Sequence, residues 1–202
     1  MSLSSTIAQP VYPIDQYLLI IRPSLPVEQR IRRLKNEIRE AFDLKVHNMQ
    51  GGYVLLARFS QYALLENKMT DKLRLIAMEA RPFLVELKDY YSHPDHVVGL
   101  RVANPAGIQA LQKALRQDQR LLHVPGHSAY FNPHPAVALA SRLQPEQYGA
   151  IWKKYKNRHF HAKFVADNMV LLRKRAGDSR WIVVDQMTLQ NLPVSSRQGV
   201  LF

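Results

Sequence analysis

The chain has 202 residues, of which 47% are hydrophobic and 22% are charged, a composition typical of one folded domain and not of a disordered chain. It contains no cysteine, which excludes disulfides, thiolate metal sites and cysteine nucleophiles. Twenty-eight Lys and Arg against sixteen Asp and Glu give a net charge of +12, which favours a phosphate-bearing partner.

The N-terminal residues contain no basic segment that leads into an apolar run, and no stretch approaches the roughly 18 apolar residues of a transmembrane helix. We therefore expect a cytoplasmic protein with no membrane partner. The sequence has no glycine-rich phosphate loop and no dinucleotide fingerprint, so we predict no cofactor. It does not indicate an oligomeric state.

The predicted elements begin after an irregular segment, residues 1–13. Residues 17–21 form a continuously apolar strand. Apolar residues three and four positions apart between residues 27 and 42 then predict an amphipathic helix, whose other side is rich in Arg and Lys. That basic side would suit phosphates, although a solvated helix face paired with nearby glutamates is the simpler interpretation.

Two glycines at positions 51 and 52 predict a turn into a strand over residues 53–59. Apolar residues fill both sides of this strand, so we expect it in the centre of a sheet, covered on both faces. Two-residue alternation places Tyr53 and Leu55 on one face and Arg58 on the other.

The second half of the chain continues the alternation of strands and helices. Asn104 and Pro105 predict a capped helix start, and Pro145 opens a further helix. The remaining patterns predict a helix over 65–80 and strands over 83–87, 97–102, 160–165, 169–173 and 181–184.

This order predicts an α+β fold with mainly antiparallel sheets. Residues 132–140 repeat the turn-and-strand character of residues 50–59 about eighty positions later. We therefore expect two pseudo-symmetric lobes, flanked by helices, that face each other across a groove. Both lobes would belong to a single domain, residues 14–190, with residues 191–202 as a C-terminal tail.

The order of elements and the stretches 52–59, 132–134 and 160–184 resemble the 2H phosphoesterase superfamily, which includes bacterial 2′-5′ RNA ligase-like proteins and cyclic phosphodiesterases. The resemblance runs from about Tyr17 to Leu189. It implies that each lobe supplies a His-x-Thr/Ser motif to the groove. One histidine would act as general base and the other as general acid, while the hydroxyls hold the phosphate, and no metal is needed.

Both motifs are altered in this chain. The first reads Tyr53-Val54-Leu55, so a phenol replaces the imidazole and an alkyl group replaces the hydroxyl. The second reads His134-Pro135-Ala136 in one register, or Ala136-Val137-Ala138 when it is counted back from residues 140–143. A phenol with a pKa near 10 is a poor general base at neutral pH.

These changes predict a groove that binds a phosphorylated ligand, such as an RNA end or a nucleotide, with weak or no phosphodiesterase activity. Two alternatives stay open: an active cyclic phosphodiesterase or 2′-5′ RNA ligase-like enzyme of altered chemistry, and an interaction protein whose groove is filled. The candidate catalytic residues are Tyr53 and His134, and the candidate groove residues are Leu55, Arg58, Ala136 and Arg142, with the two arginines as phosphate contacts.

Histidine pairs and basic clusters give weaker signals. We predict no metal site, because nothing in the sequence brings together the pairs at 93 and 96, 123 and 127, and 159 and 161. His159 or His161 would supply a substitute imidazole if its strand faced the groove, although solvent-facing positions are the simpler interpretation. Basic segments at 153–158 and 173–180 are candidate contacts to nucleic-acid phosphates.

Overall fold

A computed structural model describes residues 12–45, 52–93 and 96–192 of the chain. Most of the predicted N-terminal segment and C-terminal tail, and Gly51 of the predicted turn, lie outside these residues. The described helices are α1 (Leu25–Ala41), α2 (Glu66–Glu79), α3 (Ala106–Gln117) and α4 (Pro145–Tyr155), with 3₁₀ turns at Ala63–Leu65 and Gln119–Leu121. The described strands are β1 (Ile14–Ile21), β2 (Val54–Tyr62), β3 (Phe83–His93), β4 (Val97–Val102), β5 (Tyr130–Phe131), β6 (Ala136–Ala140), β7 (His161–Ala166), β8 (Asn168–Lys174) and β9 (Ile182–Thr188).

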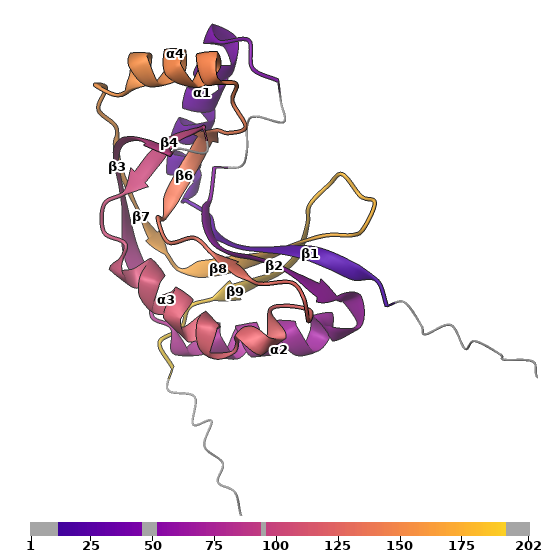
Figure 1. The fold of residues 1–202 in the computed structure, drawn as a ribbon. Helices are drawn as coiled ribbons and strands as arrows, with labels where there is room; N and C mark the ends of the chain where they lie inside the picture. The colour runs from indigo at the N-terminus through magenta and orange to yellow at the C-terminus, as the bar shows by residue number, and fades with distance from the viewer. Residues whose placement is uncertain (1–11, 46–51, 94–95, 193–202) are drawn as a thin grey trace, which may run out of the picture.

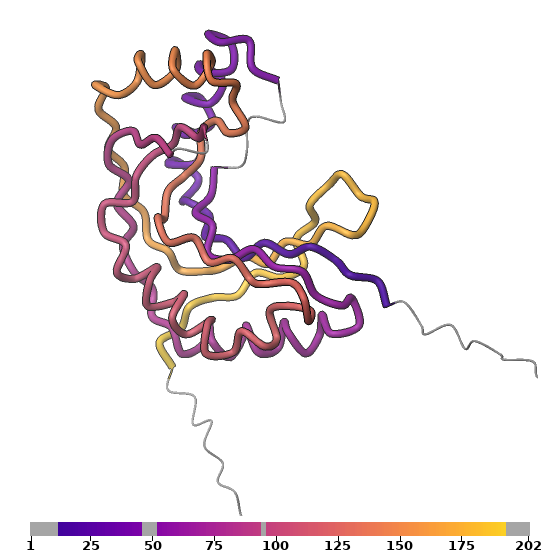
Figure 2. Tube along the Cα trace, in the orientation of Figure 1, coloured from indigo at the N-terminus to yellow at the C-terminus, as the bar shows by residue number. Residues whose placement is uncertain are grey.

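The strands form one curled sheet in which every described pair is antiparallel. The strand order is β7-β3-β4-β6-β2-β1-β8-β9, with β5 beside β2. Four strands therefore lie on each side of the boundary between β6 and β2, one set for each lobe. Figures 1 and 2 show that the chain curves around a concave face. The predicted α+β fold of two pseudo-symmetric lobes is confirmed.

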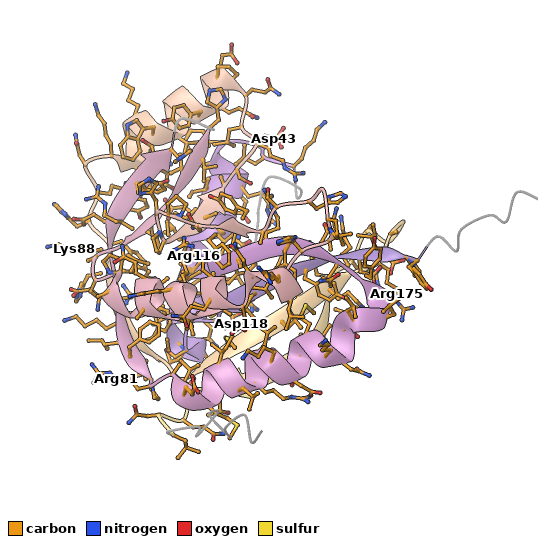
Figure 3. All side chains as sticks on the ribbon, turned by 60° about the horizontal axis from the view of Figure 1, so that its bottom comes forward. Asp43, Arg81, Lys88, Arg116, Asp118 and Arg175 are labelled. Carbon is orange, nitrogen blue, oxygen red and sulfur yellow. The ribbon has the colours of Figure 1, made fainter. Side chains whose placement is uncertain are left out.

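The two lobes exchange helices across their boundary. Helix α1 connects β1 to β2 but packs against β6, whereas α3 connects β4 to β6 and packs against β2 as well as β3. Helices α1 and α4 therefore lie together at one end of the molecule, and α2 and α3 lie side by side at the other (Figures 1 and 3). Between α2 and α3, Lys72 Nζ lies 3.3 Å from Asp118 Oδ2. None of the described helices is long and apolar enough to cross a membrane.

The predicted stripe of α1 is buried as its spacing requires, because Val27, Ile31 and Ile38 belong to the main core between sheet and helices. The predicted role of Asn104 as a helix cap is wrong. Its side-chain amide instead donates to Leu84 O at 2.8 Å and its Oδ1 accepts from Glu86 N at 2.7 Å. Asn104 thus satisfies backbone groups of β3, and α3 begins without a side-chain cap.

The lobes meet where β2 pairs with β6, and Val54 lies opposite Val137 at that point. Both valines are fully buried. On the other side of β6, Gly99 of β4 approaches so closely that a Cβ atom would lie 2.6 Å from Val137 O. Only glycine therefore fits at position 99 without moving the backbone of β6.

We expect Gly99→Ala to destabilise the protein by roughly 1–3 kcal/mol, since the new methyl group would push against backbone and not against a flexible side chain. Gly149→Ala is the matched control, because Gly149 is an exposed residue of α4 with no atom within 4 Å of where its Cβ would lie. That control should stabilise the protein by about 0.5–1 kcal/mol. Urea unfolding of both variants measures the difference, and equal effects would contradict the close approach of β4 to β6.

Candidate functional site

The two motif strands lie side by side at the centre of the sheet. Because β2 and β6 are antiparallel and Val54 faces Val137, Tyr53 lies beside Ala138 and Leu55 beside Ala136. The valines point into the core, and the four flanking residues line the opposite, concave face. A two-fold rotation about the valine pair exchanges Tyr53 with Ala136 and Leu55 with Ala138. The alanine pair, and not His134, is therefore the geometric counterpart of Tyr53 and Leu55.

Arg58 lies on the same concave face as Tyr53, so the alternation that placed it on the opposite face is wrong. The reason is a β-bulge, because the β1–β2 ladder slips at Leu56, which has no partner in β1. The β4–β6 ladder slips in the same way at Leu139. An extra residue in each strand shifts the alternation by one position, which turns the residues after the bulge to the other face.

A buried glutamine supports the bulge in β2. Gln112 of α3, which is 2% exposed, donates from Nε2 to Leu56 O at 2.9 Å. The same nitrogen donates to Asn132 O at 2.9 Å, and Asn132 Oδ1 accepts from His134 N at 3.1 Å. Gln112 therefore connects the bulge that redirects Arg58 to the loop that carries His134.

The concave face between the lobes encloses a cavity of about 840 Å³, a size typical of small-molecule sites. Leu55 and Arg58 reach it from β2, Tyr53 reaches it from the position just before β2, and Ala136 reaches it from β6. The remaining two predicted residues come from the flanks of β6, with His134 in the loop before the strand and Arg142 after it. All six predicted site residues therefore line one cavity.

The cavity is cationic. Arg58, Arg142 and Lys174 line it together with the imidazoles of His93 and His134, and none of its described lining residues is an aspartate or a glutamate. Arg142 has a φ of 54°, a left-handed conformation that costs a non-glycine residue of the order of 1 kcal/mol. The backbone is therefore strained at Arg142, one of the cations that line the cavity. Such an arrangement favours an anionic ligand.

Two aromatic rings position cations at the rim of the cavity. The Arg58 guanidinium carbon lies 5.4 Å from the centre of the Tyr130 ring, and Lys174 Nζ lies 5.6 Å from the centre of the Trp181 ring. Both rings line the cavity and are partly exposed. Cation–π contacts hold these charges toward the cavity without neutralising them.

The phenol of Tyr53 is a hydrogen-bond donor and not a base at neutral pH. Burial raises its pKa, an effect that the positive charge of Arg58 only partly offsets. The three positions related to it around Val54 and Val137 carry alkyl side chains, Leu55, Ala136 and Ala138. The floor of the cavity therefore has no imidazole and no aliphatic hydroxyl at these four positions.

The remaining histidines do not converge. His161 Nε2 lies 2.8 Å from Glu86 Oε1 and His159 Nδ1 lies 3.2 Å from Asp89 Oδ1, and neither histidine lines the cavity. Within residues 12–45, 52–93 and 96–192, no three His, Asp or Glu side chains are placed to hold a metal ion. The sequence predicted a strand over residues 83–87 only, but β3 continues to His93. Tyr91 and His93 are two positions apart in β3 and therefore share a face of the strand, and both line the cavity. This spacing was the sequence signal for their shared position.

Solved structures of low sequence identity share this fold. E. coli LigT complexed with 3′-AMP is 16% identical, with a TM-score of 0.58 over 88% of this chain and 98% of that chain. E. coli LigT complexed with NADP+ is 15% identical, with a TM-score of 0.56 over 88% of this chain and 99% of that chain. The protein TT0787 of Thermus thermophilus is 16% identical, with a TM-score of 0.59 over 87% of this chain and 98% of that chain.

Comparison with curated protein sequences gives no match. The family model of the 2′-5′ RNA ligase superfamily, in contrast, matches residues 23–178, which is well over half of the chain. This match agrees with the two-lobed fold and with the resemblance to 2H phosphoesterases. The chain therefore belongs to the 2′-5′ RNA ligase superfamily.

Proposed function

We propose that the protein binds a phosphorylated ligand, an RNA end or a nucleotide, in the groove between its lobes and has weak or no phosphodiesterase activity. The observation that carries this proposal is the cavity with three cations and no carboxylate among its described lining residues. Arg58 and Arg142 approach it from the two sides of the central strand pair. Guanidinium groups in this position would form charge-assisted hydrogen bonds to phosphate oxygens.

The loss of catalysis follows from the four positions around the central valines. Acid–base catalysis of phosphodiester cleavage needs one group that accepts a proton and one that donates it. Tyr53 stays protonated, so it could donate a proton but not accept one. Ala136 can do neither. Removing one such group commonly costs about two to four orders of magnitude in rate.

An altered enzyme is the second candidate, because two imidazoles, His93 and His134, still line the cavity. In that case His134 or Tyr53 would act as an acid–base group on a cyclic phosphate or a 2′-5′ linkage. A filled groove, the third possibility, is disfavoured by the volume of about 840 Å³. The related E. coli LigT was solved with 3′-AMP, ATP and NADP+, which supports a phosphorylated small molecule as the ligand here.

We expect Arg58→Ala and Arg142→Ala each to weaken binding of 3′-AMP about tenfold or more, since a hydrogen bond to a charged group contributes about 1.5–3 kcal/mol. Arg120→Ala is the matched control, because Arg120 is exposed and does not line the cavity. Isothermal titration calorimetry at two salt concentrations measures the affinities. Equal affinities for the Arg58, Arg142 and Arg120 variants would place the ligand elsewhere.

We expect weak or no turnover of 2′,3′-cyclic nucleotides and 2′-5′-linked dinucleotides by the native chain. A variant with Tyr53→His, Leu55→Thr, Ala136→His and Ala138→Thr should gain measurable hydrolysis, because these positions face one cavity. Chromatography of the products, with a heat-denatured sample as blank, measures the activity. Turnover by the native chain that disappears in His134→Ala would instead establish the altered enzyme.

A further inference from the structure

The groove floor of the first lobe is a hydrocarbon surface. Leu18, Ile20, Val170 and Leu172 form a buried cluster separate from the main core, and Tyr53 and Leu55 pack against it. Four of these six residues, those at positions 18, 53, 55 and 172, line the cavity. The cationic groove therefore has an aliphatic strip of Leu18, Leu55 and Leu172 beside its polar lining residues, which include Gln16, Asn132 and Ser179.

This apolar surface is part of a straight row of paired residues that crosses four strands, with an arginine in β2 and aliphatic side chains in β1, β8 and β9. Leu18 of β1 pairs with Arg58 of β2 on one side and with Leu172 of β8 on the other. Leu172 pairs in turn with Val183 of β9. Directly opposed residues of antiparallel strands share a face, so the row of Arg58, Leu18, Leu172 and Val183 lies on the concave face.

The row has a charged end and an open apolar end. Arg58 is in the centre of the molecule beside the strand boundary, and Val183 is in the edge strand of the sheet. Val183 is 52% exposed and the neighbouring Trp181, which lines the cavity, is 37% exposed. At a strand spacing of about 4.8 Å, the row from β2 to β9 is roughly 14 Å long.

We propose that the ligand of this groove is a phosphomonoester that carries a hydrocarbon chain, with the phosphate at Arg58 and Arg142 and the chain along Leu18 and Leu172 toward Val183. This inference rests on the proposed function for the phosphate site at Arg58 and Arg142, and it changes the preferred ligand there: an alkyl phosphate should bind more tightly than a nucleotide such as 3′-AMP. The absence of carboxylates from the described lining residues suits the phosphate, and the aliphatic row suits the chain.

The aliphatic strip at Leu18 and Leu172 suits a hydrocarbon chain better than a nucleobase, which would stack instead on aromatic lining residues such as Tyr130 and Trp181. A base that lay on leucine side chains would lose water from its polar edges without gaining hydrogen bonds, which costs free energy for each group. A hydrocarbon chain has no such groups, and each buried methylene contributes about 0.8 kcal/mol. The family resemblance implies a phosphate-holding hydroxyl at position 55. Leu55 has an alkyl side chain there, which makes the floor more apolar.

The test is a titration of the full-length protein with methyl, butyl and octyl phosphate below their aggregation concentrations, with 3′-AMP and octanol as reference compounds. Affinity should rise by up to about fourfold for each methylene, and octanol should bind much more weakly than octyl phosphate. If 3′-AMP binds but the chain adds no affinity, this inference fails and the proposed function stands. If no phosphate compound binds, the proposed function fails as well.

A pair of exposed valines provides the matched variants. Val183→Ser should reduce the affinity for octyl phosphate about threefold to tenfold and leave methyl phosphate unchanged. Val165→Ser is the control, since Val165 is 54% exposed in β7, the opposite edge strand. Equal affinities of the two variants for octyl phosphate would overturn the path of the chain. Binding only to vesicles of phosphatidic acid, and not to octyl phosphate, would overturn the small-molecule ligand.

Discussion

The pairing of Val54 with Val137 is the contact on which the rest of the site depends. It joins two lobes that each have four strands in the sheet, and it fixes the rotation that relates them. Both valines are fully buried, and the exchanged helices α1 and α3 pack against β6 and β2. Because β2 and β6 pair at this point, each lobe contributes one strand whose residues on the concave face line a single cavity. The duplicated architecture thus creates the groove, independently of which side chains occupy it.

The side chains that occupy these positions determine what the groove can do. A phosphodiesterase of this fold needs proton-transfer groups where β2 pairs with β6, and this chain has a protonated phenol and alkyl groups there. The cations around this strand pair, Arg58, Arg142 and Lys174, are positioned by a β-bulge, a strained backbone conformation and two aromatic rings. The proposed function therefore separates binding from catalysis, since the features that would attract an anion are distinct from those that would cleave it.

The sequence predicted the parts of the fold that depend on local spacing, such as the buried stripe of α1 and the repeat of a strand about eighty residues later. It did not predict that Arg58 faces the groove, because a bulge at Leu56 depends on pairing with β1 and on Gln112, which lies 56 positions away. Asn104 was misread for a related reason: its partners are in β3. Local patterns report periodicity, whereas these features depend on contacts between distant segments.

The most direct measurement of the central claim is a crystal structure of the protein soaked with 2′,3′-cyclic AMP. The account predicts an intact cyclic phosphate above the pair of Val54 and Val137, in contact with Arg58 and Arg142. A ring-opened nucleotide in the groove would contradict the loss of catalysis. An empty groove, with the nucleotide bound elsewhere on the basic surface, would contradict the site itself.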